Sequence, residues 1–342
     1  MGGAPRVAVV GAGSWGTAFS MVPADKGQAT VLWARRQDLA DTIAKEHENP
    51  DYLEGVRLPD SLTATHDMEE AVAGSDIVVM AVPSHAFRKV FEEVTPLLQR
   101  DATVVSLVKG IEQETLKRMS EVVMEAGDLP QDRVAAVSGP NLAKEIVKRQ
   151  PSASVVACVD EERAEMLREA FSVPFFRVYV NPDVVGVELG GAFKNVIALA
   201  AGIGDGMGFG DNSKASLITR GLAEIARLGK QMGGNPLTFA GLAGMGDLIA
   251  TCISPLSRNR HVGEELGKGR TIDEIVSEMK MVAEGVRTSR AVVRLGEKLG
   301  VDVPIAEHVC KVIYDGLSPK EMLKSLMERD AKPELHGLDD DA

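Results

Sequence analysis

The sequence predicts an α/β domain followed by an all-helical domain. Three observations point to this fold class. Short, apolar, β-branched runs alternate with helical patterns over the first half of the chain, a glycine-rich turn follows the first run, and the runs stop near residue 181. The 342 residues are 44% hydrophobic and 26% charged, which is typical of a globular protein and excludes a disordered or collagen-like chain.

Seven runs are expected to form strands, because each is short, apolar and bounded by polar or glycine-containing segments. They cover residues 6–10, 29–33, 76–82, 102–107, 134–137, 152–159 and 175–180. Helices are expected from about Thr17, over 85–98 and over 114–126. Pro23 should end or kink the first of these helices early. Strands separated by helices imply a parallel sheet with right-handed crossovers.

The second part of the chain has helical patterns throughout. Long helices are expected over 184–202 and 212–232, with helical structure continuing to about residue 328. We therefore expect an α/β domain over 1–185, a helical domain over 186–330 and an acidic tail over 331–342.

Charge and cysteine content limit the partners of the chain. Asp and Glu number 50 against 38 Lys and Arg, giving a net charge of −12, so we expect no nucleic-acid partner. The apolar runs are strand-length, none approaches the roughly 20 residues of a membrane span, and no signal-peptide core precedes the first strand. Cys158, Cys252 and Cys310 lack metal-ligand spacing, so we expect reduced thiols, no bound metal and a cytoplasmic location.

A glycine-rich turn follows the first predicted strand. Gly11, Gly13 and Gly16 form the pattern G-A-G-S-W-G, which includes Ser14 and Trp15. The first glycine permits a tight strand-to-helix turn, the second lets the backbone approach a pyrophosphate, and the third lets the helix lie close to the sheet. The N-terminus of the helix favours the negative charge of the pyrophosphate. The turn therefore predicts a Rossmann-like dinucleotide-binding domain.

A second glycine-rich run follows a helical stretch rather than a strand. It contains Gly202, Gly204, Gly206 and Gly208. Because a nucleotide-binding turn should follow a strand, we interpret this run as a turn that connects two helices.

The end of the second predicted strand indicates which dinucleotide is bound. A site selective for NAD usually has Asp or Glu there, whereas this chain has Arg35 and Arg36, and its first acidic residue is Asp38. A guanidinium offers planar bidentate donors to the 2′-phosphate of NADPH. We expect NADPH to be preferred and NADH to be usable. The alternative is that both arginines are solvated surface charges.

Six further segments carry a resemblance to a known family. They are S-L-V-K-G-I-E (106–112), S-G-P-N-L-A-K-E (138–145), G-G-A-F-K-N-V-I-A (190–198), G-M-G-D-L-I-A-T-C (244–252), L-S-R-N-R (256–260) and E-G-V-R-T (284–288). With these segments in order, the chain resembles bacterial NAD(P)-dependent glycerol-3-phosphate dehydrogenase over about residues 6–325. The resemblance implies a homodimer and the reversible NAD(P)H-dependent reduction of dihydroxyacetone phosphate to sn-glycerol 3-phosphate, for glycerophospholipid synthesis.

Three charged residues are candidates for the carbonyl chemistry. Lys194 lies in an apolar helical stretch, where an ammonium costs free energy unless it is paired, so it is either functional or snorkelling to water. A lysine can stabilise a developing alkoxide and donate a proton to it. The resemblance makes Lys194 the general acid/base and assigns Lys109 to substrate and cofactor. Asp247 either orients a lysine in the substrate site or caps a helix, and Thr251 is a further candidate.

The remaining candidates are polar or small residues. Ser257, Arg258 and Asn259 form a donor-rich triplet suited to a phosphoryl group, and the resemblance places Arg258 at both substrate and cofactor. Asn141, also assigned to the substrate, replaces the Ser or Thr usual in the family, so its geometry should differ. Gly139 should approach the substrate through its backbone. Tyr52 and Ala143 should also approach the cofactor, and the resemblance places Val282 and Glu284 near its ribose and nicotinamide.

Two other functions remain open on the sequence. A 3-hydroxyacid dehydrogenase can be built from the same fingerprint, a helical domain and an active-site lysine, but a carboxylate substrate would not explain the whole 256–260 segment. A non-catalytic NADPH sensor would need neither Lys194 nor Lys109, and both are present.

Overall fold

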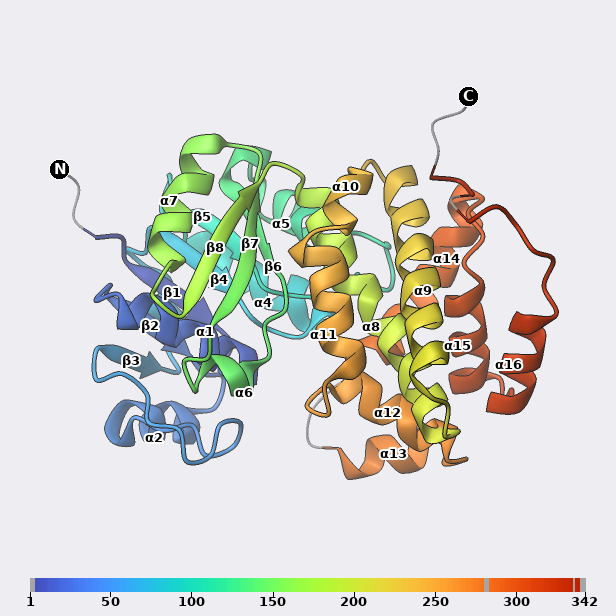
Figure 1. The fold of residues 1–342 in the computed structure, drawn as a ribbon. Helices are drawn as coiled ribbons and strands as arrows, with labels where there is room; N and C mark the ends of the chain where they lie inside the picture. The colour runs from blue at the N-terminus through green and yellow to red at the C-terminus, as the bar shows by residue number, and fades with distance from the viewer. Residues whose placement is uncertain (1–3, 280–282, 335, 339–342) are drawn as a thin grey trace. The chain divides into compact units, whose positions relative to one another are not determined.

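The computed structural model describes residues 4–279, 283–334 and 336–338 (Figure 1). The chain divides into two compact units. The sheet unit comprises Met1–Val108 and Met119–Val184, and the helical unit comprises Lys109–Arg118 and Val185–Ala342. The 109–118 segment thus belongs with the helices, although the chain on both sides of it belongs with the sheet.

The sheet unit contains an eight-stranded sheet in the order β3-β2-β1-β4-β5-β6-β7-β8. In chain order the strands are β1 (Val7–Val10), β2 (Thr30–Trp33), β3 (Leu62–Thr65), β4 (Ile77–Met80), β5 (Thr103–Ser106), β6 (Val134–Ser138), β7 (Ser152–Cys158) and β8 (Phe176–Asn181). All neighbouring strands are parallel except β6 and β7. The predicted α/β fold is confirmed, and all seven predicted strands are present.

The sheet differs from the predicted one at two points. The edge strand β3 was not expected, because its sequence LTAT is short and buries only its two end residues. The strands β6 and β7 are antiparallel, which corrects the expectation of an all-parallel sheet. Their connection contains only the four-residue helix α6 (Ala143–Ile146) in place of a full crossover helix.

Helices cover both faces of the sheet, because alternate residues of each strand point to opposite sides. Val7 and Val9 of β1 share a core with α1 (Ser14–Asp25), α2 (Gln37–Glu46) and α7 (Glu161–Phe171). Ala8 and Val10 share the other core with α3 (Met68–Val72), α4 (Phe87–Val94) and α5 (Met119–Gly127). The sheet is therefore the middle layer of three.

Two predicted helix boundaries were wrong. The helix α1 continues through Pro23 to Asp25, since the missing N–H group of a proline near the last turn removes only one intrahelical hydrogen bond. The helix α5 begins at Met119 rather than near residue 114, because the 109–118 segment is not helical and Leu116 has a φ of +61°.

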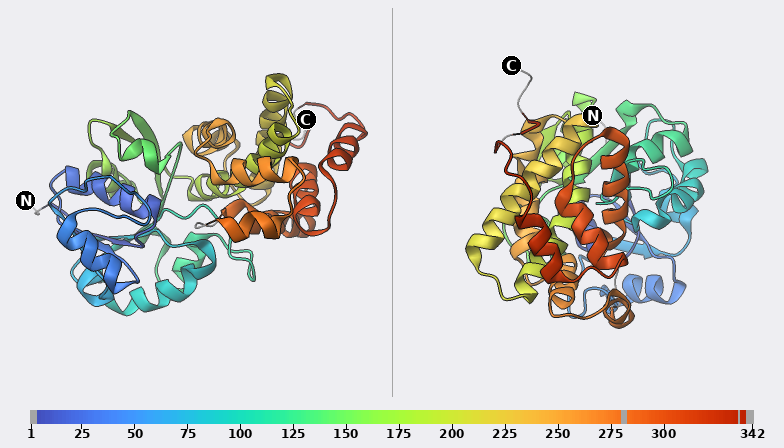
Figure 2. Two further views of the ribbon diagram at one scale, coloured as in Figure 1. Left: turned by 90° about the horizontal axis from the view of Figure 1, so that it is seen from below. Right: turned by 90° about the vertical axis from the view of Figure 1, so that its right-hand side faces the viewer.

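The helical unit is formed mainly by the chain after β8, and no described residue beyond Asn181 belongs to a strand. Figure 2 shows these helices from two further directions. They are α8 (Val184–Gly206), α9 (Asp211–Gln231), α10 (Pro236–Phe239), α11 (Asp247–Ile253), α12 (Arg258–Gly267), α13 (Ile272–Glu278), α14 (Glu284–Leu299), α15 (Pro304–Tyr314) and α16 (Pro319–Met327). The predicted all-helical architecture is confirmed.

The core of the helical unit is built around α8. This helix contradicts the expectation that apolar runs are only strand-length, since it is long and apolar enough to span a membrane. Of its most apolar window, however, 94% is buried inside the structure, which is the property of a core helix. Residues Pro236–Ile253 pass the same test of length and composition, with 44% of their window buried.

The glycine run at the end of α8 was predicted to be a turn, and this prediction was wrong. The run is part of the helix as far as Gly206. A Cβ atom on Gly202 would lie 2.0 Å from the carbonyl oxygen of Arg260 in α12. In return, Cβ atoms on Gly263 and Gly267 of α12 would lie 2.0 and 2.3 Å from carbonyl oxygens of α8. The glycines therefore let two helix backbones pack directly against each other, and the chain turns only at Gly208, where φ is +83°.

The end of the chain packs on α9 as far as it is described. Arg220 and Lys230 of α9 donate hydrogen bonds to the carbonyl oxygens of Glu334 (2.8 Å) and Leu338 (3.2 Å). The predicted tail over 331–342 is therefore not purely solvated, while its acidic residues 339–341 lie outside the described residues.

Candidate active site

The glycine-rich turn of the fingerprint connects β1 to α1 in the sheet unit. Gly11 has a φ of +122°, and a Cβ atom there would lie 2.7 Å from the carbonyl oxygen of Ala81. A Cβ atom on Gly16 would lie 1.9 Å from the carbonyl oxygen of Gly11. A Cβ atom on Gly13, in contrast, would meet nothing within 4 Å among the described residues. The first and third glycines therefore serve the packing of the turn, and the second leaves room for a ligand.

The turn also presents a helix N-terminus that suits an anion. The helix α1 begins at Ser14 without a side-chain cap and without an acidic residue in its first turn. The N-terminal N–H groups of α1 and the helix dipole therefore favour the negative charge of a phosphate. Trp15 packs edge-to-face on Phe19, with 5.6 Å between the ring centroids, and Ser14 Oγ donates a 3.3 Å hydrogen bond to the carbonyl oxygen of Tyr52. The turn and the helix N-terminus could thus hold the pyrophosphate of a dinucleotide, and Tyr52 lies beside the turn.

Asn49 is a residue of this turn that the sequence analysis missed. Its fully buried amide nitrogen donates to the carbonyl oxygen of Ala12 (3.0 Å) and to Thr17 Oγ1 (2.8 Å), and its amide oxygen accepts from the backbone of Tyr52 (3.3 Å). Asn49 thus fixes the glycine turn to the loop that carries Tyr52. A single asparagine in a loop gives no pattern from which this role could be predicted.

The two arginines after β2 have different surroundings. Arg36 is the N-cap residue of α2, and its guanidinium pairs with Asp51 and, at 3.5 Å, with Asp38. Arg35 is exposed and forms no hydrogen bond or ion pair within the described part of the chain. Arg35 is therefore the better placed of the two to receive a phosphate.

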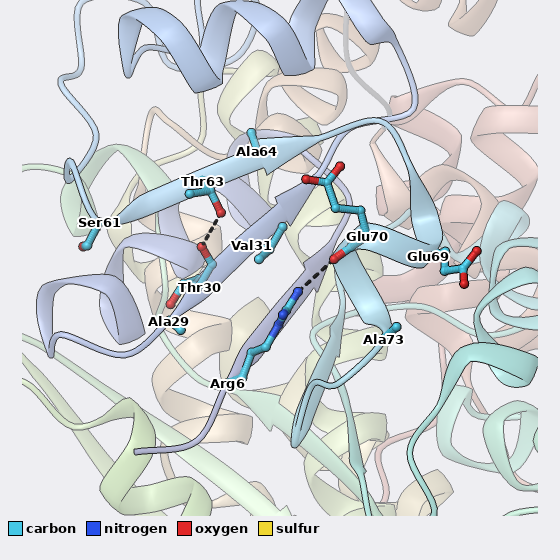
Figure 3. Close-up of a pocket in the computed structure, with 10 residues that line it drawn as sticks. All are labelled: Arg6, Ala29, Thr30, Val31, Ser61, Thr63, Ala64, Glu69, Glu70 and Ala73. Atoms are coloured by element: carbon cyan, nitrogen blue, oxygen red, sulfur yellow. Dashed lines mark hydrogen bonds between the residues drawn. The ribbon is translucent and has the colours of Figure 1, made fainter. Parts of the chain in front are cut away.

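A cavity of about 550 Å³ lies at the opposite end of the same strands (Figure 3). It is lined by Arg6 before β1, by residues before and within β2 and β3, and by Glu69, Glu70 and Ala73 in or just after α3. Arg6 Nη2 donates a 2.8 Å hydrogen bond to the carbonyl oxygen of Glu70. No predicted site residue lines it. Because nucleotides bind at the carboxyl ends of parallel strands, this cavity is not the cofactor site.

Residues 139–143, which follow β6, include three predicted site residues, and the side chain of Asn141 is bound within the sheet unit. Gly139 has a φ of +145°, which favours glycine. The amide of Asn141 accepts a 3.0 Å hydrogen bond from Ser154 Oγ and donates one of 3.3 Å to the carbonyl oxygen of Ala153. Asn141 therefore anchors this segment to β7. Ala143 is the first residue of α6.

In the helical unit, a single buried carboxylate binds two lysines. Asp247 accepts hydrogen bonds from Lys109 Nζ at 2.6 Å and from Lys194 Nζ at 2.5 Å, one on each carboxylate oxygen. The Asp247 side chain is 2% exposed, and those of Lys109 and Lys194 are 15% and 7% exposed. Residues separated by 138 positions in the sequence thus form one cluster, which we call the Lys–Asp–Lys cluster.

Local structure explains why Asp247 points into this cluster. A π-helical turn, Leu242–Gly246, precedes α11, and Asp247 is the first helical residue rather than the N-cap. The capping interpretation of Asp247 was therefore wrong. A Cβ atom on Gly190 of α8 would lie 2.7 Å from the carbonyl oxygen of Ala243, so this turn lies directly against the helix that carries Lys194.

The environment of Lys194 makes its proton labile. Burial lowers the pKa of Lys194 from 10.5 to about 8, and the nearby Asp247 carboxylate opposes this shift. Lys194 Nζ also donates to Thr251 Oγ1 at 2.5 Å, and Thr251 Oγ1 donates to the backbone carbonyl of Asp247 at 2.7 Å. A buried ammonium with a pKa near neutrality is suited to general acid/base chemistry.

The predicted phosphate triplet is only partly available to a ligand. Ser257 is the N-cap residue of α12, and its Oγ accepts from the backbone N–H of Arg260 at 3.2 Å. Asn259 donates to Asn195 Oδ1 and accepts from the backbone N–H of Gly285, both at 2.9 Å. Arg258 is exposed and interacts with the nearby charge of Glu284, and its planar guanidinium is suited to binding a phosphate.

Asn195 is a second residue that the sequence analysis missed. Its Nδ2 donates a 3.1 Å hydrogen bond to the carbonyl oxygen of Lys109. Together with Asn259 it forms a chain of amides from the first turn of α14, where Glu284 is the first residue, to the backbone of Lys109. The predicted cofactor residue Val282 lies outside the described residues.

In the described part of the chain, no group of three or more His, Cys, Asp or Glu residues could hold a metal ion. Cys158, Cys252 and Cys310 are free thiols.

Comparison with known proteins agrees with the resemblance over nearly the whole chain. Residues 6–164 match the family model described as the N-terminus of NAD-dependent glycerol-3-phosphate dehydrogenase, and residues 183–324 match the model of its C-terminus. Glycerol-3-phosphate dehydrogenase [NAD(P)+] of Thermobifida fusca (strain YX) is 54% identical over 97% of this chain and 99% of its own length. The enzyme of the same name from Streptomyces griseus is 53% identical over 96% of this chain and 98% of its own length.

Solved structures agree. The crystal structure of glycerol-3-phosphate dehydrogenase from Coxiella burnetii matches 95% of this chain and 99% of its own chain with a TM-score of 0.90, at 36% identity. The chain belongs to the NAD-dependent glycerol-3-phosphate dehydrogenase family.

Proposed function

We propose that this protein catalyses the reversible reduction of dihydroxyacetone phosphate to sn-glycerol 3-phosphate with NADPH or NADH, and so supplies glycerophospholipid synthesis. The observation that carries the proposal is the Lys–Asp–Lys cluster, in which a carboxylate 2% exposed holds two ammonium groups. Relatives 51–54% identical to this chain carry the name glycerol-3-phosphate dehydrogenase [NAD(P)+], which supports use of both cofactors.

The cofactor would be held by the turn between β1 and α1. Gly13 leaves room for its pyrophosphate, the uncapped N-terminus of α1 favours the phosphate charge, and Arg35 faces no competing carboxylate within bonding distance among the described residues. When bound, NAD(P)H supplies the hydride that reduces C2 of the substrate. We infer that NADPH is preferred, because Arg35 can bind its 2′-phosphate.

Lys194 would donate the proton that the reduction requires. Hydride addition to C2 leaves negative charge on the carbonyl oxygen, and a lysine with a pKa of about 8 can transfer a proton to that oxygen as the alkoxide forms. In the reverse direction, neutral Lys194 removes the proton from the C2 hydroxyl. Asp247 and Thr251 hold the ammonium in one orientation through 2.5 Å hydrogen bonds.

Lys109 would bind the carbonyl oxygen and Arg258 the phosphate of the substrate. The two lysines leave the cluster with an excess of positive charge over the single carboxylate of Asp247, and in a buried site this charge stabilises a developing oxyanion. The guanidinium of Arg258 can bind two phosphate oxygens at once. We further propose that Gly139 and Ala143 approach the ligands through backbone groups, and that Glu284 accepts a hydroxyl of the cofactor.

We also propose that the enzyme is a cytoplasmic homodimer composed of a cofactor domain (1–185), a substrate domain (186–330) and a short tail. Three free thiols support a reducing compartment. Sedimentation equilibrium on the purified chain tests the oligomeric state.

The reaction itself is tested by following the transferred hydrogen. Purified protein is incubated with dihydroxyacetone phosphate and NADPH carrying deuterium at both positions on C4 of the nicotinamide. The expected product is sn-glycerol 3-phosphate with one deuterium on C2, detected by NMR. Consumption of NADPH without deuterium on C2 would contradict the proposal.

A further inference from the structure

The 109–118 segment presents Lys109 to the cluster, and both of its ends bind α8. At one end, Asn195 Nδ2 donates to the carbonyl oxygen of Lys109 at 3.1 Å. At the other end, Arg118 Nη1 forms an ion pair of 2.8 Å with Glu188 Oε2. Glu188 and Asn195 are seven residues apart and so lie on one face of α8, about 10 Å apart along its axis.

The 109–118 segment is folded back on itself, so the position of Arg118 at one end fixes that of Lys109 at the other. Ile111 pairs with Arg118 as an antiparallel bridge, and the backbone N–H of Glu112 donates to the carbonyl oxygen of Lys117 at 3.0 Å. The side chain of Ile111 is buried in the core of the helical unit. Arg118 therefore lies directly across from Ile111, which is two residues from Lys109.

The ion pair is buried: the side chains of Arg118 and Glu188 are 11% and 4% exposed. Solvent screening is therefore weak, and removal of either partner leaves a charge in a poorly hydrated place. Glu188 lies on the same helix as Lys194, the proposed proton donor, six positions before it.

We propose that Arg118 and Glu188 are positioning residues of the reaction: their ion pair fixes the 109–118 segment on α8 and thereby places the Lys109 ammonium relative to Lys194 and Asp247. Neither residue touches the reacting atoms, and both act through Lys109. The inference rests on the proposed function, since it assigns the two residues to that reaction.

A double-mutant cycle between Arg118→Met and Lys109→Met tests the inference. We expect Arg118→Met to lower kcat/KM for dihydroxyacetone phosphate about 10-fold to 100-fold, because a displacement of about 1 Å in an active site can cost this much. In the Lys109→Met background the same change should cost less than about 2-fold, since the group it positions is already absent. Arg270→Met, which removes ion pairs with Glu265 and Glu278 elsewhere in the helical unit, should leave kcat/KM unchanged.

Folding is followed by circular dichroism for every variant. If Arg118→Met is not folded, Glu188→Gln takes its place in the cycle, because glutamine keeps the shape and one acceptor while removing the charge. Equal losses from the Arg118 change with and without Lys109 would overturn the inference, as would a folded Arg118→Met variant with wild-type kcat/KM. A wild-type protein without activity would instead refute the proposed function.

Discussion

At the scale of single residues, Lys194 has a pKa set by two opposing effects. Burial favours the neutral amine and lowers the pKa to about 8, while the Asp247 carboxylate favours the ammonium. The ammonium is the form that donates a proton during ketone reduction, and the amine is the form that accepts one during alcohol oxidation. The two directions of the reaction should therefore depend on pH in opposite ways.

We predict that kcat/KM for reduction of dihydroxyacetone phosphate falls as the pH rises above about 8, and that kcat/KM for oxidation of glycerol 3-phosphate rises over the same range. Asp247→Asn should move both transitions to lower pH, because it removes the charge that stabilises the ammonium. Initial rates between pH 6 and 10 measure these profiles. A reduction rate that stays level to pH 10 would exclude Lys194 as the proton donor.

Lys194→Ala should lower kcat at least about 10²-fold, the lower end for loss of a general acid. Affinity for NADPH, measured by fluorescence titration, should be unchanged, because the fingerprint turn is in a different part of the chain. Wild-type turnover in this variant would remove Lys194 from the mechanism.

Arg35 and Arg36 provide a matched pair for cofactor selectivity. Cofactor preference is expressed as the ratio of kcat/KM for NADPH to kcat/KM for NADH. Arg35→Ala should lower this ratio about 10-fold to 100-fold, because the 2′-phosphate loses its charge-assisted hydrogen bonds to the guanidinium. Arg36→Ala should change the ratio far less, because its guanidinium already pairs with Asp51 and Asp38. Equal effects of the two changes would show that this distinction is wrong.

At the scale of elements, the crossing of α8 and α12 depends on glycines from both helices. A Cβ atom on Gly263 would lie 2.0 Å from the carbonyl oxygen of Leu199, a backbone atom that cannot move aside by rotating. Gly204, in the same run of α8, would place its Cβ at an ordinary 3.7 Å from Phe209. Packing therefore requires glycine at position 263 but not at position 204.

We predict that Gly263→Ala lowers the free energy of unfolding by about 2–3 kcal/mol through overpacking. Gly204→Ala is the control and should raise it by up to about 1 kcal/mol, because alanine is the better helix former. Chemical unfolding midpoints compare the two. Similar effects of both substitutions would mean that the close approach of the helices is not what the glycines provide.

At the scale of the whole molecule, one buried carboxyl makes stability depend on pH. Glu224 of α9 is 3% exposed and accepts the backbone N–H groups of Ile305 and Ala306 at 2.9 and 3.0 Å, so it caps the N-terminus of α15 from another helix. Burial raises the pKa of Glu224 to about 7, and these hydrogen bonds and the charge of Arg227 only partly oppose the shift.

The sign of the effect follows from proton binding. Between about pH 4.5 and 7 the folded state keeps a proton on Glu224 that the unfolded state has lost, so its contribution to stability falls as the pH rises through this window. The fall is on the order of 3 kcal/mol. Glu224→Gln should remove this loss of stability. Between pH 5 and pH 8, the Tm of the variant should therefore fall less, or rise more, than the Tm of the wild type. An identical difference in both proteins would contradict the raised pKa.

The parts of this account that could be predicted from the sequence are those with a local pattern. Gly11, Gly13 and Gly16 are recognisable because a strand precedes them and a helix follows. The cofactor turn and most strands were therefore found without a structure. Lys109 and Asp247 were identified singly, but no local pattern shows that one carboxylate binds two lysines 85 residues apart in sequence.

Contacts between distant elements could not be predicted. The assignment of the 109–118 segment to the helical unit, the role of Asn49 behind the glycine turn and the capping of α15 by Glu224 all depend on which surfaces pack together. The glycines of α8 were misinterpreted as a turn for the same reason, because their partner glycines lie in another helix. A single sequence, taken without comparison to its relatives, gives no information on such pairs.

The central claim is most directly tested by initial rates of NADPH and NADH oxidation by the purified protein. Dihydroxyacetone phosphate is the substrate, unphosphorylated dihydroxyacetone is the control for the phosphate, and a 3-oxoacid is the control for the alternative class of reaction. We predict rapid oxidation that requires the phosphate and is faster with NADPH than with NADH. No oxidation with dihydroxyacetone phosphate, or equal rates with and without the phosphate group, would contradict it.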